Sequence, residues 1–80
     1  MNNMEQVKVF INSVVKIKYF NELMSKYPGR HVDLVSGRYR VPANSLMGIF
    51  SLDTSKPLTL EFEDEYRDFI YEKFSQFMVD

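Results

Sequence analysis

Cysteine is absent from this sequence of 80 residues, and glycine and proline occur only three times each. Without thiols the chain cannot form a disulfide framework or a cysteine-based metal site. Without clustered glycines it lacks a phosphate-binding glycine loop. The apolar runs are far too short for a membrane span, and residues 1–5 do not begin like a secretory signal. These absences favour a soluble, cytoplasmic protein that uses no cofactor and has no membrane as partner.

The hydrophobic content is sufficient for one packed domain. The chain length lies near the lower end of what a lone hydrophobic core can support, so we expect a single domain over residues 1–80. A hydrophobic share of 45%, including 15% aromatic residues, is ample for such a core and argues against disorder.

Charge is distributed unevenly, although the formal net charge is only −1. Residues 1–60 contain eight Lys and Arg against four acidic residues, whereas residues 61–80 contain seven acidic residues against two basic ones. The acidic solvent-facing side of a terminal helix explains this pattern. The alternative is a basic recognition surface formed by Lys16, Lys18, Arg38 and Arg40. Its charge is too small to favour a nucleic acid as partner.

Hydrophobic periodicity predicts a strand and then a helix in the first third of the chain. Apolar residues alternate over Val7–Ile11, as in a half-buried strand. Asn12-Ser13 can then cap a helix whose apolar residues recur at spacings of three and four. Pro28-Gly29 ends that pattern, which predicts a helix over residues 14–27.

The middle of the chain predicts a hairpin and a short helix. Val32–Leu34 and Tyr39–Val41 alternate like strands, and Ser36-Gly37 between them is a tight-turn pair. In the segment Asn44–Leu52, a capping residue precedes apolar residues that share one helical side.

A last strand and a last helix complete the chain. Leu58–Phe62 has apolar residues at every second position. Asp64 is expected to cap a helix that reaches Phe77, and acidic residues crowd its first turn, where they favour the positive end of the helix dipole.

The order of elements predicts the fold class. It reads strand, helix, strand, strand, helix, strand, helix, and every strand has one apolar face. We therefore expect an α+β fold in which helices cover only one side of a four-stranded, mostly antiparallel sheet.

This order, together with the centre of the sequence, resembles HPr, the phosphocarrier family of the bacterial sugar phosphotransferase system. The resemblance rests on the hairpin segment Val35–Arg38 and on Asn44–Leu52, which reads Asn-Ser-Leu-Met-Gly-Ile-Phe-Ser-Leu. HPr proteins, particularly those of Gram-positive bacteria, have a similar hairpin and then a Lys-Ser-Ile-Met-Gly-Val-Met-Ser-Leu-like segment. The resemblance implies an open-faced β-sandwich with three helices on one face of the sheet.

The phosphoryl acceptor of that family has no counterpart here. It is a histidine in a Gly-x-His-x-Arg-Pro segment at the start of the first helix, where helix amides and the arginine hold the phosphate. The corresponding segment Ser13–Lys18 contains no histidine, arginine or proline. Val14 or Val15, depending on a one-residue gap, occupies the acceptor position and cannot form a phosphoramidate. The resemblance therefore implies a non-catalytic regulatory or protein-binding module and not an enzyme.

Ser45 matches the serine that HPr kinase phosphorylates in many Gram-positive HPr proteins. A phosphate there would meet free amides and the positive end of a helix dipole. The alternative is that Ser45 only caps the short helix, which contributes about 1 kcal/mol. A regulatory HPr homologue modified at Ser45 by a serine kinase is thus a second hypothesis.

Met47 and Phe50 correspond to family positions that form an exposed patch for docking partner proteins. Lys16 and Lys18 are expected to lie beside that patch, and a flexible methionine next to an aromatic ring suits an adaptable contact. The implied partner is a protein such as enzyme I, HPr kinase or a transcriptional regulator of the phosphotransferase system, with a role in sugar transport regulation. The alternatives are that Met47 and Phe50 complete the core, or that a purely structural domain dimerises through them.

The remaining polar residues favour structural roles. His31, the only histidine, precedes the second strand at the far end of the first helix, so we expect a partly exposed strand-edge residue and no metal site. Glu61 and Glu63 alternate on one strand face, which a solvated surface explains better than acid–base catalysis. In the segment Arg38–Arg40, alternation would place Tyr39 inward and the arginines outward.

Overall fold

The computed structural model describes residues 3–79, and these residues form one four-stranded sheet. Its strands are β1 (Met4–Val9), β2 (Val32–Ser36), β3 (Tyr39–Pro42) and β4 (Leu58–Glu63). Their spatial order is β1-β4-β2-β3, and every neighbouring pair is antiparallel. The predicted four-stranded antiparallel sheet is confirmed, with β1 and β3 as its edges.

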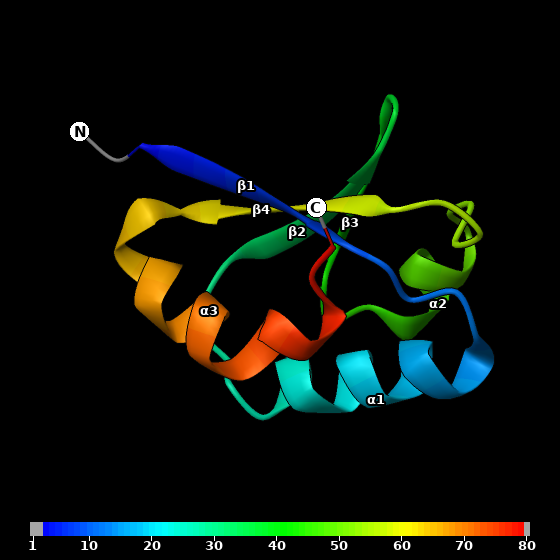
Figure 1. Ribbon diagram of the computed structural model, residues 1–80, viewed down its shortest axis with the longest axis horizontal. Helices are drawn as coiled ribbons and strands as arrows, with labels where there is room; N and C mark the ends of the chain where they lie inside the picture. Colours follow the sequence, from blue (N-terminus) through cyan, green and yellow to red (C-terminus); the bar gives the residue numbers. More distant parts are fainter. Residues whose placement is uncertain (1–2, 80) are drawn as a thin grey trace.

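Three α-helices accompany the sheet within residues 3–79: α1 (Val14–Ser25), α2 (Leu46–Phe50) and α3 (Arg67–Phe74). Short 3-10 turns extend α3 at both ends, η1 at Asp64–Tyr66 and η2 at Ser75–Phe77. All three helices lie on one side of the sheet (Figure 1). The predicted α+β class with one-sided helices is confirmed, and it is compatible with the open-faced sandwich that the HPr resemblance implies.

Helix α1 begins at the expected cap and ends slightly early. Ser13 has an extended backbone, and its Oγ accepts a hydrogen bond from the Lys16 N–H at 3.1 Å. The helix ends at Ser25 and not at residue 27. Lys26 and Tyr27 follow in a tighter turn, where their N–H groups donate to carbonyls three residues back at 3.2 Å each.

Strand β1 lies earlier in the chain than the strand expected over Val7–Ile11. Its pairing ends at Val9, which lies opposite Leu58, the first residue of β4. Ile11 is fully buried outside the sheet. Its apolar character therefore reflects packing in the core and not membership of the strand.

The last helix has the expected extent, but the expected cap is wrong. Helical structure runs from Asp64 to Phe77 through η1, α3 and η2. A capping side chain has to stand on the residue before the helix, and that residue is Glu63, which makes no capping hydrogen bond. Asp64 lies inside the first turn, and its N–H donates to the Asn3 carbonyl at 2.8 Å.

Aromatic rings fill the centre of the core between the sheet and the helices. Phe20 of α1 and Phe74 of α3 are fully buried, and their ring centroids are 5.4 Å apart. Phe77 meets Phe20 edge-on at 5.2 Å, a favourable arrangement for two rings. Alternate side chains of β4 close the core from the sheet side, each at most 1% exposed. These are Leu58, Leu60 and Phe62.

The helix-free face of the sheet carries a connected set of polar side chains. Arg40 of β3 donates to Asp33 of β2 at 3.1 Å and to Glu61 of β4 at 2.5 Å. Gln6 of β1 donates to the same Glu61 at 2.8 Å, so hydrogen bonds link all four strands. Asp33 is only 6% exposed, and Arg40 supplies its countercharge.

This polar set overturns two expectations about charge. One alternative for the first half of the chain was a basic recognition surface that includes Arg40. Because Arg40 is bound to two carboxylates, it adds no free positive charge to such a surface. Glu61 is a half-buried ion-pair partner and not a solvated residue. Cross-strand neighbours, which the local pattern does not reveal, are the physical reason in both cases.

Tyr39 does not point into the core as alternation predicted. It is 67% exposed, whereas Val41, on the same face of β3, is half-buried. Tyr39 lies next to the turn of the β2–β3 hairpin, which extends beyond the helices (Figure 1). No helix is close enough there to cover the ring.

Arg40 also controls the protonation of Glu61. Its hydrogen bond is the main cause that lowers the pKa of Glu61, and the hydrogen bond from Gln6 acts in the same direction. A carboxyl group whose pKa is lower in the folded state stabilises the fold above its unfolded pKa. That stabilisation is lost as the pH falls through the folded pKa.

We expect Glu61→Gln to lower the free energy of unfolding at pH 7, because it removes the charged partner of Arg40. The difference from wild type should shrink as the pH falls from the ordinary pKa of glutamate through the lower folded pKa of Glu61, because Glu61 itself then becomes protonated. Urea unfolding at pH 7 and pH 3 measures both effects. Glu22→Gln, at an exposed position of α1, is the control and should follow wild type. A Glu61→Gln deficit that is the same at both pH values would contradict the expectation.

Candidate functional site

The two candidate acceptor positions lie in the first turn of α1. Val14 and Val15 are apolar but 56% and 78% exposed. The preceding Ser13 already uses its hydroxyl oxygen to cap the helix. The start of α1 is therefore accessible to solvent, and it presents branched hydrocarbon side chains.

Ser45 and Gly48 determine how α2 begins. The Ser45 Oγ accepts a hydrogen bond from the Gly48 N–H at 3.1 Å, so the predicted cap is confirmed. A Cβ on Gly48 would lie 3.0 Å from both the Ser45 Oγ and the Val41 Cβ, which is too close for normal contact. Packing, and not a special backbone angle, therefore favours glycine here, because an added methyl group would require Ser45 or Val41 to shift by a few tenths of an ångström. Phosphorylation of Ser45 stays a prediction.

The outward side of α2 is strongly apolar. Met47 is 81% exposed and Phe50 is 43% exposed, whereas Ile49 is fully buried. The expectation that Met47 points outward is confirmed, and the alternative that it completes the core is wrong. Ile49 is the buried side chain of α2 and Leu46 packs half-buried against the core, which leaves Met47 and Phe50 in solvent.

Helices α1 and α2 bring the exposed apolar residues to one end of the molecule. The start of α1 lies beside α2, and the two helices are in contact (Figure 1). Of the nine large hydrophobic side chains exposed among residues 3–79, five belong to α1 and α2, and four of these lie in the first turn of α1 or in α2. We refer to these four as the α1–α2 surface: Val14, Val15, Met47 and Phe50.

The two lysines expected beside this surface behave differently. Lys16 bonds through Nζ to the Asn12 Oδ1 at 3.2 Å and lies 5.8 Å from the centroid of the Phe10 ring. Its side chain is therefore directed to the loop before α1. Lys18 is exposed and forms no ion pair within residues 3–79, so its charge is available to a partner.

His31 lies outside this surface, as predicted. Its side chain is 76% exposed, and Nε2 is 3.2 Å from the Asp33 Oδ2. It directly precedes β2, after the loop that leaves the other end of α1 (Figure 1). Its position confirms an exposed strand-edge histidine.

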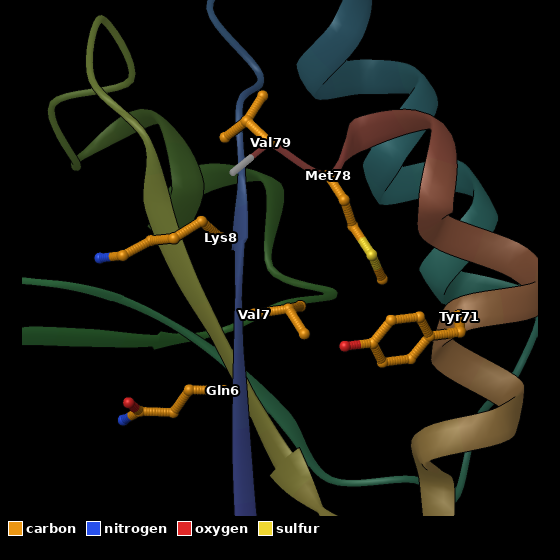
Figure 2. Close-up of a pocket in the computed structure, with 6 residues that line it drawn as sticks. All are labelled: Gln6, Val7, Lys8, Tyr71, Met78 and Val79. Atoms are coloured by element: carbon orange, nitrogen blue, oxygen red, sulfur yellow. The ribbon is translucent and has the colours of Figure 1, made fainter.

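A cavity of about 300 Å³ lies elsewhere, between β1, α3 and the chain after α3. Figure 2 shows its lining, which includes Val7, Tyr71 and Met78. Sequence reasoning missed this cavity because its walls come from opposite ends of the chain, and no local pattern links them.

The described part of the chain can also be compared with the requirements of a metal site and of a membrane span. Within residues 3–79, no three His, Asp or Glu side chains are grouped so that they could hold a metal ion. No helix among these residues combines the length and the apolar character needed to cross a membrane.

Comparisons with known proteins do not decide the family. The chain matches no protein-family model, no curated protein and no solved structure. The α+β fold and the exposure of the α1–α2 surface rest on the structure, whereas membership of the HPr family, the function and the partners stay predictions.

The close contact at Gly48 gives a direct test of how α2 is held. In most helices Gly→Ala is stabilising, but here the added methyl group would press on Ser45 and Val41. We expect Gly48→Ala to destabilise the protein by about 1–2 kcal/mol. Met47→Ala, one residue away and exposed, should change stability by less than about 0.5 kcal/mol. Urea unfolding measures both, and a more stable Gly48→Ala protein would contradict the packing argument.

Proposed function

We propose that this chain is a non-catalytic protein-binding module of the HPr type, which acts in the regulation of sugar phosphotransferase in the bacterial cytoplasm. The proposal rests on the exposed side chains of the α1–α2 surface. Val14 and Val15 stand where the resemblance would place a nucleophile, and Met47 and Phe50 are exposed as well. Loss of the acceptor removes phosphate transfer, and the retained apolar surface supports binding.

The fold supports this proposal. The order of elements and the one-sided helices are those that the HPr resemblance implies. The segment Asn44–Leu52, which carries the resemblance, contains α2 and its cap Ser45. The same segment supplies Met47 and Phe50 of the α1–α2 surface.

The exposure of Met47 also favours a binding role. A methionine that is 81% exposed contributes nothing to the core, and its flexible thioether adapts to the shape of a partner. Burying it together with Phe50 would remove apolar area from water at roughly 25 cal/mol per Å². Lys18 beside them can add electrostatic selectivity for acidic groups on a partner.

We expect no phosphate transfer to this chain from enzyme I and phosphoenolpyruvate, because hydrocarbon occupies the acceptor position. Intact-mass spectrometry after incubation with both reagents measures the result. An HPr protein with its acceptor histidine is the positive control and must gain one phosphate in the same mixture. A phosphorylated form of this chain, at His31 or elsewhere, would overturn the non-catalytic assignment.

Binding through the α1–α2 surface is tested with purified enzyme I, HPr kinase and a transcriptional regulator of the phosphotransferase system. We expect at least one of them to be retained by the immobilised wild-type chain. A Met47→Asp/Phe50→Asp variant should lose that binding, because it places two charges in the contact. Tyr39→Asp, at an exposed ring next to the turn of the β2–β3 hairpin, is the matched control and should bind normally. Equal binding by all three forms would exclude the surface.

The second candidate function is regulation by phosphorylation of Ser45. It is favoured by the position of the Ser45 Oγ at the start of α2, where it already meets the Gly48 amide at 3.1 Å. A phosphate there would accept from the same amides. Mass spectrometry after treatment with HPr kinase and ATP, with Ser45→Ala as the control, decides it. An unmodified wild-type chain would remove this candidate.

A further inference from the structure

All the sulfur of this chain is in methionine side chains. The sequence contains five methionines and no cysteine, so a mild oxidant finds no thiol that reacts first. A thioether is oxidised to a sulfoxide, and a sulfur atom in solvent reacts before one that is packed in a core. The exposure of each methionine therefore indicates where an oxidant would act.

The four methionines among residues 3–79 differ widely in exposure. Met47 is 81% exposed and Met4 is 51% exposed, whereas Met24 is 4% exposed and Met78 is half-buried. Within this part of the chain, Met47 is also the most exposed of all the large hydrophobic side chains. An oxidant in solution thus reaches the sulfur of Met47 more readily than that of any other described methionine.

Helix α2 holds Met47 in place without using its side chain. The helix begins at the Ser45 cap and packs on the core through the buried Ile49 and the half-buried Leu46. Met47 follows Leu46 directly and turns outward. A chemical change at its sulfur would therefore alter the surface of the molecule and leave the core intact.

The surface to which Met47 belongs is otherwise hydrocarbon. Phe50, three residues further along α2, is exposed as well, and Val14 and Val15 complete the α1–α2 surface. Oxidation turns the flexible, apolar methionine side chain into a polar one. A polar S–O group that is buried in a contact without a hydrogen-bond donor costs free energy. A sulfoxide at Met47 would thus oppose the burial of this surface.

We propose that Met47 is a reversible oxidation site, at which hydrogen peroxide forms a sulfoxide and thereby weakens binding by the α1–α2 surface. The fold stays intact, because the oxidised side chain lies outside the core. The effect on a partner rests on the function proposed above, whereas the oxidation and the loss of apolar surface do not.

The oxidation transfers one oxygen atom from hydrogen peroxide to the Met47 sulfur. An S–O bond forms, the O–O bond breaks and water leaves, while the sulfur gives up the two electrons that the peroxide accepts. A methionine sulfoxide reductase reverses the change with two thiols, which become a disulfide as the sulfoxide oxygen leaves as water. The thiols belong to the reductase system, because this chain has no cysteine.

Met4 provides a matched control within the same chain. It is also exposed, but it is the first residue of β1, an edge strand of the sheet, and it does not belong to the α1–α2 surface. Its oxidation should leave binding by that surface unchanged. Leucine has a similar volume to methionine and no sulfur, so Met47→Leu and Met4→Leu each remove one oxidation site and keep the apolar side chain.

The oxidation site is tested on the full chain without a partner. After limited treatment with hydrogen peroxide, peptide mass spectrometry should show that Met47 gains oxygen before Met78 and Met24. Retention on a hydrophobic-interaction column then reports the apolar surface. Oxidation should shorten the retention of wild type and of Met4→Leu, and most of this shift should be lost in Met47→Leu. Urea unfolding of the oxidised chain should match that of the untreated chain.

The effect on binding is tested with the partner protein that the untreated chain retains among enzyme I, HPr kinase and the transcriptional regulator. Oxidised wild type and oxidised Met4→Leu should bind about tenfold more weakly than before treatment, whereas Met47→Leu should bind equally before and after. Methionine sulfoxide reductase with a thiol should restore binding by wild type. A bound partner should in turn protect Met47 from peroxide, because the two events oppose each other reciprocally.

Three results would overturn the proposal. The first is oxidation of Met24 or Met78 that keeps pace with that of Met47. The second is a retention shift that is equal in Met47→Leu and Met4→Leu. The third is oxidised wild type that binds its partner as tightly as the untreated chain. If the untreated chain binds none of the three proteins, the proposed function fails instead, and the retention of the two variants still decides the oxidation site.

Discussion

The fold depends on β4, because this strand pairs on both sides and also closes the core. It joins β1 to β2, and its alternate side chains, including Leu60 and Phe62, are buried beneath the helices. A slip of one residue in its register would expose these side chains and turn Glu61 into the core. The burial of one face therefore fixes the register, and the register in turn places Glu61 within reach of Arg40 on the other face.

The same one-sided core explains why the α1–α2 surface exists. Phe20 of α1 and the rings of α3 and η2 already fill the space beneath the sheet. The five-residue α2 adds Ile49 to that core, and Met47 is left outside. Large exposed apolar groups on a small domain are usually retained for contact with another molecule. The binding function proposed for this end thus follows from packing as well as from resemblance.

Local sequence patterns were sufficient for the elements and insufficient for the contacts between them. The caps at Ser13 and Ser45 and the alternation along β4 depend on neighbouring residues, so the sequence alone predicts them. The bonds of Arg40 to Asp33 and Glu61 join three strands, and the bridge between Val9 and Met78 joins the two ends of the chain. Strand order decides such contacts, and no periodicity encodes strand order.

Backbone and capping hydrogen bonds, and not the side chains of Val14 and Val15, hold the start of α1. The Ser13 Oγ accepts from the Lys16 N–H, and the Ser13 carbonyl accepts from the Ile17 N–H at 2.9 Å. The side chains of Val14 and Val15 point into solvent and contribute little to the core. A histidine at either position would therefore not be needed for stability. The first turn of α1 can therefore differ in side-chain chemistry while the helix and the sheet stay in place.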